Sequence, residues 1–126
     1  MKRIINTQQA PAAIGPYSQA VEANGTLYIS GQLPVDPATG RIESDDVAAQ
    51  TAQSFKNIAA ILEAAGYTSA DVVKHTVFLA DMADFAAMND VYRQVYAADC
   101  PARSAFAVKA LPMGARVEIE TIAMKG

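Results

Sequence analysis

The sequence has little of what disulfide-bonded, membrane-spanning or haem- and metal-binding proteins require. Its 126 residues contain one cysteine, one histidine and no tryptophan. The single cysteine, Cys100, cannot form a disulfide within the chain, and its presence alone fits a reducing compartment. No run approaches the roughly 18 consecutive apolar residues of a membrane span, and the first residues turn polar at once, unlike a signal peptide. We therefore expect a cytoplasmic protein that does not enter the membrane.

Sequence motifs for nucleotide and metal chemistry are also missing. The chain has no glycine-rich dinucleotide fingerprint, no phosphate-binding loop, no HExxH and no CxxC. We therefore expect no cofactor and no metal. The one possible nucleophilic pair is Cys100 with His75, but His75 belongs to a strand-like run and a lone thiol is more often a small buried side chain. We interpret both residues as structural.

The charge balance argues against a polyanionic partner. Ten basic and thirteen acidic residues give a net charge of −3, and the basic residues form no run. Proteins that bind nucleic acids gather lysine and arginine on one surface. With 52% apolar residues the chain can bury a core. We expect one domain that spans residues 1–126 and does not bind nucleic acid.

The first quarter of the chain predicts a β-hairpin. Two alternating runs, Ser18–Ala23 and Thr26–Ser30, flank Asn24–Gly25, and both turn residues tolerate the positive φ of a type I′ turn. Two prolines and two glycines then predict a loop over Gly31–Gly40. A short additional strand is expected at Lys2–Ile5.

A long amphipathic helix is predicted to begin at Val47. Asp45 or Asp46 is placed to cap it, and Gly66 is placed to end it. Apolar or small residues recur at helical spacing at Val47, Thr51, Phe55, Ile58, Leu62 and Ala65.

The second half of the chain predicts a strand, a helix and two strands. Val72–Ala80 is rich in β-branched residues and alternates, with Val73, His75, Val77 and Leu79 expected on one face. Asp84 is placed to cap a helix that Pro101 prevents from continuing, with Phe85, Met88, Tyr92 and Val95 on one face. Ser104–Val108 and Ala115–Met124 are expected to be the last strands.

This order of elements predicts an α+β domain in two layers, with two helices on one face of a sheet. In the last strand Glu118 and Glu120 alternate with the more apolar Val117, Ile119 and Thr121. Two helices can cover only one face, so the other face is left bare. We expect copies of the chain to cover it in a closed oligomer.

Polar residues at the ends of the predicted elements are the candidates for chemistry, and they are Tyr17, Ser30, Asn89, Arg103 and Glu118. Arg103 can grip a carboxylate with two parallel hydrogen bonds, or it can form an ordinary surface ion pair. Glu118 can act as an acid or base where neighbours desolvate it, or it can be a solvated strand carboxylate. Spacing alone does not separate Glu118 from Glu120, which shares its face.

Five segments carry a resemblance to a known family. They are Pro11–Ala20, Tyr28–Gln32, Val77–Met82, Pro101–Ser104 and Val117–Glu120. In this order they resemble the successive blocks of the reactive intermediate deaminase family, the RidA or YjgF type, across nearly the whole chain. The resemblance implies a chorismate-mutase-like fold, a mixed sheet covered on one face by two helices, and a homotrimer with sites in clefts between subunits.

The resemblance also implies an activity that needs no cofactor. Family members hydrolyse 2-imino acids, such as 2-aminoacrylate and 2-iminobutyrate, to 2-keto acids and ammonia. Arg103 would hold the substrate carboxylate and Glu118 would assist the attacking water. The residues that would line the pocket are Tyr17, Ser30, Gly31 and Asn89. At Ala105 many relatives have a cysteine, so only the backbone carbonyl of Ala105 could help to hold the water.

Three other functions stay open at this point. A module that binds keto acids or other small carboxylates could use the same clefts without turnover. A ribonuclease or translation inhibitor is opposed by the acidic balance. The third is holdase behaviour through the apolar surface, and no feature of the sequence argues for or against it.

Overall fold

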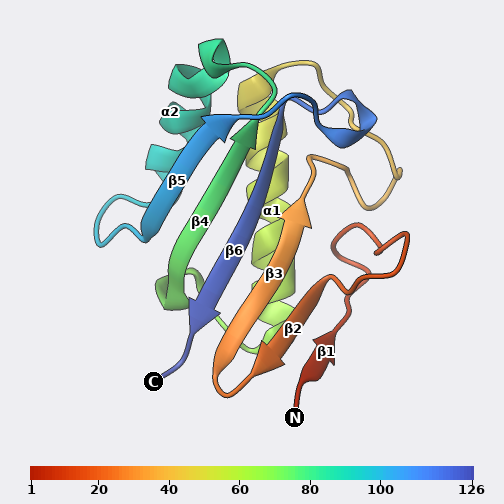
Figure 1. Ribbon diagram of the computed structural model, residues 1–126, viewed down its shortest axis with the longest axis vertical. Coiled ribbons are helices and arrows are strands. Elements are labelled where there is room, and N and C mark those ends of the chain that lie inside the picture. The colour runs from red at the N-terminus through yellow and green to blue at the C-terminus, as the bar shows by residue number, and fades with distance from the viewer.

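The computed structural model describes residues 1–126 and contains one six-stranded sheet with two α-helices. The strands are β1 (Arg3–Ile5), β2 (Ala20–Ala23), β3 (Thr26–Gln32), β4 (Val72–Leu79), β5 (Ala102–Ala107) and β6 (Val117–Met124). The helices are α1 (Val47–Ala65) and α2 (Phe85–Val95), and short 3₁₀ turns occupy η1 (Ser69–Asp71), η2 (Met82–Asp84) and η3 (Pro112–Gly114). Both helices lie behind the sheet in Figure 1, and no helix covers the face toward the viewer. The predicted α+β class and the two layers are confirmed.

The sheet is mixed, with strand order β1-β2-β3-β6-β4-β5. Only β4 and β5 run parallel, and every other neighbouring pair is antiparallel. Strands β5 and β6 follow one another along the chain but are not neighbours, because β4 lies between them. The sheet therefore places β6 near its centre and β5 at one edge.

The predicted hairpin is confirmed between β2 and β3. Asn24 has φ 52° and Gly25 has φ 75°, so both turn residues adopt the left-handed conformation of a type I′ turn. The loop predicted from Gly31 begins two residues later, because β3 continues through Gln32. Gln32 pairs with Ile119 of β6 after a register shift, and this pairing extends the strand.

Helix α1 begins and ends where its capping residues predict. The carboxylate of Asp46, not that of Asp45, accepts a hydrogen bond of 3.0 Å from the backbone N–H of Ala49. Gly66 ends the helix with φ 82°, a left-handed conformation that glycine adopts without strain. The predicted apolar face of the helix is buried against the sheet.

Strand β4 departs from simple alternation at its start. Val72 is buried with 7% of its surface exposed, whereas Val73 is 41% exposed. The prediction that Val73 shares a face with His75 is therefore wrong. The cause is a register shift between Val72 and Lys74 in the pairing with β6, which inserts an irregularity that periodicity does not show.

Helix α2 is held at its start by an ion pair instead of the predicted cap. Asp84 occupies the cap position but makes no capping hydrogen bond. Its carboxylate accepts hydrogen bonds from Nε of Arg116 at 3.1 Å and from NH2 of Arg116 at 2.6 Å. The capping carboxylate nearby is that of Asp81, which accepts from the N–H of Ala83 in η2. Val95, predicted to share a face with Met88 and Tyr92, is 39% exposed, whereas those two residues are buried.

Strand β5 begins at Ala102, two residues before its predicted start, because it pairs in parallel with β4 from Lys74 onward.

In β6 the predicted alternation is confirmed. Val117 and Ile119 are fully buried and Thr121 is nearly so, whereas Glu120 on the opposite face is exposed. The core, a cluster of 19 buried residues, therefore fills the space between the sheet and the helices. Neither α1 nor α2 has the length and hydrophobicity that a membrane-spanning helix needs.

Candidate active site

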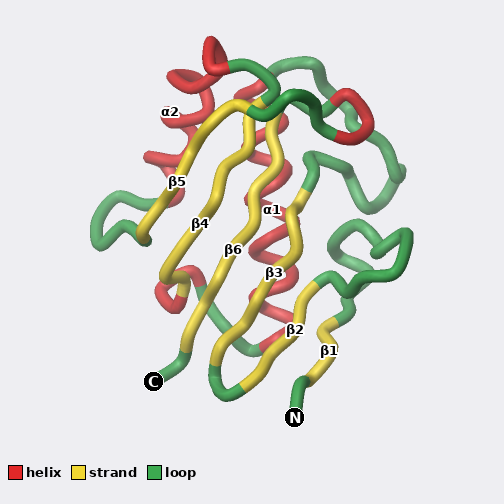
Figure 2. Tube along the Cα trace, viewed as in Figure 1, coloured by secondary structure: helices red, strands yellow, loops and turns green.

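A cavity of about 890 Å³ opens beside β3 and β6. It is bordered by the loop between β1 and β2, the segment after β3 and the η3 turn, which gather at one side of the sheet in Figure 2. Four predicted site residues line it, namely Tyr17, Ser30, Gly31 and Glu118. The structure therefore brings these four together from three separate parts of the chain.

Glu118 approaches the backbone of β3 closely. A Cβ atom at Gly31 would lie 2.7 Å from Oε2 of Glu118, well inside normal contact distance. Glycine at this position therefore makes room for the carboxylate. Burial, and then the negative charge of neighbouring Glu120, raise the pKa of Glu118 above its ordinary value. Glu118 is thus the carboxyl of the cavity whose pKa is raised.

Ser30 and Tyr17 differ in how firmly the chain holds them. The hydroxyl of Ser30 donates a hydrogen bond of 2.6 Å to the carbonyl of Ser18, so it ties β3 to the preceding loop. The ring of Tyr17 is 55% exposed at the mouth of the cavity. Ser30 therefore has a structural partner within the chain, whereas Tyr17 is free to contact a ligand.

Gln19 is a residue of the cavity that the sequence did not single out. Its side chain is buried, and its amide accepts a hydrogen bond from the N–H of Thr7 at 2.8 Å. The same amide donates to the carbonyls of Thr7 at 3.0 Å and Pro11 at 2.8 Å. These bonds tie the two ends of the loop between β1 and β2 together. A buried glutamine in a loop has no periodic signal by which it could have been found.

Arg103 lies away from this cavity, on edge strand β5 beside α2. Its NH1 donates a hydrogen bond of 2.7 Å to Oδ1 of Asn89. The guanidinium lies 4.6 Å from the ring centre of Tyr92 and 5.4 Å from that of Phe85. Two predicted site residues, Arg103 and Asn89, are therefore brought together, in a second polar group separate from the cavity.

Strand register places Arg103 and Glu118 on opposite faces of the sheet. Arg103 pairs with His75 of β4, and His75 pairs with Thr121 of β6. Paired residues point to the same face, and His75 and Thr121 are buried beneath the helices. Glu118 is three residues before Thr121, so its side chain points to the uncovered face. Within one chain the two predicted catalytic residues cannot contact the same small molecule.

The cavity residues and the residues around Arg103 carry complementary charges. No lysine, arginine or histidine lines the cavity, which contains the carboxyls of Glu118 and Glu120. The cavity alone therefore offers an acid–base group but no cation to bind a carboxylate. The Arg103 group offers the cation without the acid–base group. Ala105, which pairs with Val77 of β4, is on the same face as Arg103.

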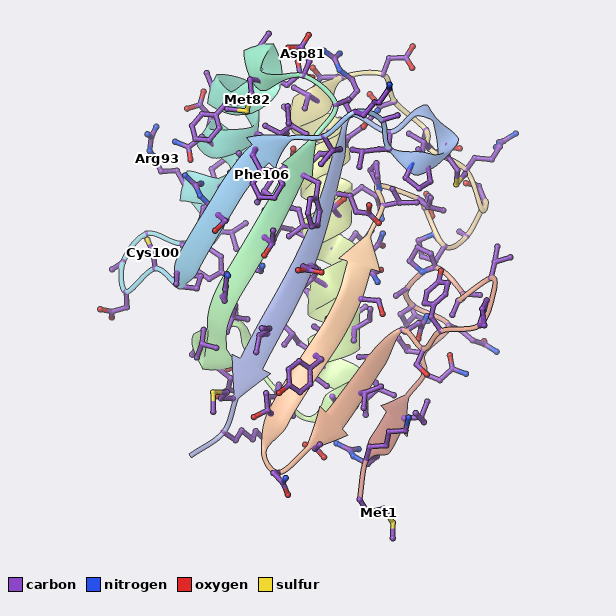
Figure 3. All side chains as sticks on the ribbon, viewed as in Figure 1. Met1, Asp81, Met82, Arg93, Cys100 and Phe106 are labelled. Carbon is purple, nitrogen blue, oxygen red and sulfur yellow. The ribbon has the colours of Figure 1, made fainter.

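His75 and Cys100 do not form a nucleophilic pair. The ring nitrogens of His75 are taken by the hydroxyl of Thr121 at 2.9 Å and that of Tyr96 at 2.6 Å. Burial lowers the pKa of His75 to about 4. Cys100 is exposed in the loop after α2, as Figure 3 shows, so the expectation of a buried thiol is wrong. The side chains form no cluster of three or more groups that could hold a metal ion.

Comparison with known proteins agrees with the fold and identifies the family. Residues 7–125 match the family model described as endoribonuclease L-PSP. The goat (Capra hircus) protein named 2-iminobutanoate/2-iminopropanoate deaminase is 55% identical over all of this chain and 92% of its own length.

Solved structures of relatives superpose closely on this chain. RidA from the Antarctic bacterium Psychrobacter superposes with a TM-score of 0.94 at 49% identity, covering 98% of this chain and 99% of its own. Escherichia coli TdcF with bound serine superposes with a TM-score of 0.93 at 45% identity, with the same coverage. The chain is therefore a member of the L-PSP family, to which the RidA and YjgF proteins belong.

Proposed function

We propose that this protein hydrolyses 2-imino acids to 2-keto acids and ammonia, without a cofactor, as a 2-iminobutanoate/2-iminopropanoate deaminase. The observation that carries this proposal is its 55% identity over its full length to a protein of that name. The cavity with Glu118 and the separate group around Arg103 support it, because hydrolysis of an imino acid needs both a carboxylate anchor and a proton-transfer group. Arg103 supplies the first and Glu118 the second.

The chemistry needs few groups because an imine carbon is already electrophilic. The guanidinium of Arg103 binds the substrate carboxylate and fixes the imine carbon relative to a water molecule. The water oxygen bonds to that carbon while Glu118 accepts a water proton and passes it to the imine nitrogen. The resulting carbinolamine then gives up its hydroxyl proton, which Glu118 transfers to the amine nitrogen, and the carbon–nitrogen bond breaks, so that ammonia leaves and the carbonyl of the keto acid forms. The raised pKa of Glu118 suits a group that both accepts and returns a proton.

We propose a homotrimer in which each site is shared by two copies. One copy contributes the cavity with Glu118, and the next contributes β5 and α2 with Arg103. Because these are different surfaces, the contact is head to tail, and such contacts form a ring where the rotation between copies closes. The uncovered face supports this arrangement, since it exposes apolar side chains at Tyr28 and Phe106, the latter labelled in Figure 3. The family resemblance favours three copies.

The remaining predicted residues fit roles around this shared site. From the cavity, Tyr17 would close over the ligand, and Gly31 would leave room for Glu118. From the other copy, Asn89 would orient Arg103, and the carbonyl of Ala105 would help to hold the water. Ser30 would support the cavity wall through its bond to Ser18.

The wider setting is also part of the proposal. One sheet and one core cluster support a single functional domain over residues 1–126. The lone exposed thiol of Cys100 suits the reducing cytoplasm.

A second candidate is a module that binds small carboxylates without turnover. It is favoured by the relative TdcF, whose structure contains bound serine, an amino acid with the same carboxylate as the proposed substrates. A ribonuclease receives no such support, because the cavity contains carboxylates and no basic residue to meet a phosphate backbone.

The test is the decay of 2-aminoacrylate and 2-iminobutyrate, generated in solution by a threonine dehydratase and trapped with semicarbazide. Wild type is compared with Arg103→Ala, Glu118→Gln and, as a matched control, Arg93→Ala. Arg93 is a solvent-exposed arginine of α2 that pairs with Asp90 at the surface. We expect wild type and Arg93→Ala to accelerate imine loss, and the other two variants to lose most of the acceleration. Wild-type rates equal to buffer, together with measurable keto-acid binding, would establish the binding module instead.

A further inference from the structure

The surroundings of Arg103 are complete within one chain and come almost wholly from one face of α2. Phe85, Asn89 and Tyr92 follow one another at spacings of four and three residues, so they form a single stripe along the helix. The stripe presents two aromatic rings and one amide oxygen to the guanidinium. We call these three residues the Arg103 cradle.

The cradle leaves N–H donors of the guanidinium free for a substrate. Aromatic rings attract the flat faces of a guanidinium, whereas a carboxylate binds along its edge through paired N–H donors. The rings of Tyr92 and Phe85 contact the group at 4.6 Å and 5.4 Å. Oδ1 of Asn89 accepts a hydrogen bond from NH1. The other N–H groups of Arg103 are left to bind a carboxylate edge.

Tyr92 acts in the cradle through its ring, not its hydroxyl. The hydroxyl is buried and has no hydrogen-bond partner. The ring is fixed from behind by edge contacts with Phe55 at 5.6 Å and His75 at 5.7 Å, and by Tyr96 at 5.3 Å. A ring held by three others gives the guanidinium a rigid surface to rest on.

We infer, building on the deaminase function proposed above, that Tyr92 is a positioning residue for Arg103, assisted by Phe85. The stacked ring restricts the long arginine side chain before substrate arrives. A free arginine would have to lose this rotamer freedom on binding the carboxylate. Loss of the ring is therefore expected to weaken substrate binding more than it slows the chemical step.

The experiment compares Tyr92→Leu, Tyr92→Phe and Phe85→Leu. Tyr92→Leu removes the ring and is expected to raise the KM for 2-iminobutyrate roughly 2- to 30-fold, with kcat changed less. Tyr92→Phe keeps the ring and is expected to restore KM to near the wild-type value. Phe85→Leu, at the longer distance, is expected to raise KM by less. Equal KM values in the Leu and Phe variants of Tyr92 would overturn the inference.

A matched control separates positioning from general stability. Tyr67 is also a buried tyrosine beneath a cation, with Nζ of Lys125 4.9 Å from its ring centre, but it contacts neither the cavity nor Arg103. Tyr67→Leu is expected to lower the melting temperature and leave KM unchanged. If it raises KM as much as Tyr92→Leu does, the effect is one of stability and the inference fails. If Tyr92→Leu does not fold, Phe85→Leu against this control decides the question.

A readout that does not depend on turnover keeps this inference distinct from the proposed function. The Nε–H resonance of Arg103 in a nitrogen-15 NMR spectrum carries the ring-current shift of a stacked guanidinium, and it is assigned by its loss in Arg103→Ala. We expect Tyr92→Leu to remove this shift and Tyr92→Phe to preserve it. An inactive wild type whose Arg103 resonance is shifted would contradict the proposed deaminase function but not the contact between Arg103 and Tyr92. An active wild type whose resonance and KM are unchanged by Tyr92→Leu would contradict only the positioning role of Tyr92.

Discussion

At the scale of single residues, the cavity depends on how closely two strands approach each other. The backbone of Gly31 is not in the left-handed region, so glycine is not needed here for its conformation. Its missing side chain leaves space for Glu118. The close atom is the far end of a flexible side chain, and that end can move aside. A larger residue at this position would therefore disturb the carboxylate while leaving the strand intact.

Gly31→Ala is accordingly expected to fold with a stability within about 1 kcal/mol of wild type, since no core contact is lost. Its kcat/KM for 2-iminobutyrate is expected to fall at least about tenfold, because Glu118 is displaced from the water that it assists. Thermal unfolding and steady-state kinetics measure the two effects. A fully active Gly31→Ala would show that the position of Glu118 is not critical.

The pH dependence of the reaction follows from the raised pKa of Glu118. As a base, Glu118 must be ionised, so kcat/KM is expected to fall as the pH drops through this raised pKa. Removing the negative charge beside it in Glu120→Gln is expected to move the fall to lower pH, because that charge raises the pKa of Glu118. A pH–rate profile from pH 4 to 9 measures the shift. A fall that stays in place, or moves to higher pH, would contradict this assignment.

At the scale of elements, the helices and strands follow local signals, and the exceptions have tertiary causes. Alternation and turn residues predicted the β2–β3 hairpin, and capping residues predicted both ends of α1. These local signals have limits. They were insufficient at Val73, where a register shift in the pairing with β6 moves the side chain to the other face. They were also insufficient at Asp84, whose carboxylate binds Arg116, a residue distant in the chain. Pairing and long-range ion pairs leave no trace in a local pattern.

Two adjacent aspartates test the capping of α1. Asp46→Ala removes the cap of Ala49 and is expected to cost roughly 1 kcal/mol of unfolding free energy. Asp45→Ala is the control, because the side chain of Asp45 makes no hydrogen bond and only its backbone carbonyl accepts one, from Arg116. Urea unfolding of both variants gives the difference. Equal losses would mean that charge near the helix start, not the cap, stabilises α1.

At the scale of the whole molecule, the sequence named four residues that line the cavity, but only the family resemblance, and no local pattern, pointed to a site divided between subunits. Arg103 and Glu118 came from two of the family-like segments, and no local pattern shows that β6 and β5 place them on opposite faces. That result follows only from the order of strands in the sheet. The supporting residues Gln19 and Tyr92 were missed or read as core for the same reason, since their partners come from other elements.

The buried His75 predicts how the fold responds to acid. Its pKa is about 4 in the folded protein, below its ordinary value, so the unfolded chain takes up a proton first as the pH falls. The stabilisation by neutral His75 is complete above about pH 6.5 and lost as the pH falls toward 4, by roughly 2 kcal/mol at pH 5. Unfolding at fixed protein concentration, at pH 7.5 and 5, is compared for wild type and His75→Gln. An equal loss in both proteins would rule out His75 as the cause.

The most direct measurement of the central claim is complementation between two inactive variants. Arg103→Ala and Glu118→Gln chains are refolded together in equal amounts, and mass spectrometry verifies that mixed oligomers form. If each site takes Arg103 from one copy and Glu118 from the next, about a quarter of the sites contain both intact residues, and imine hydrolysis returns to that fraction of the wild-type rate. Mixed oligomers that remain as inactive as either parent would contradict a shared deaminase site.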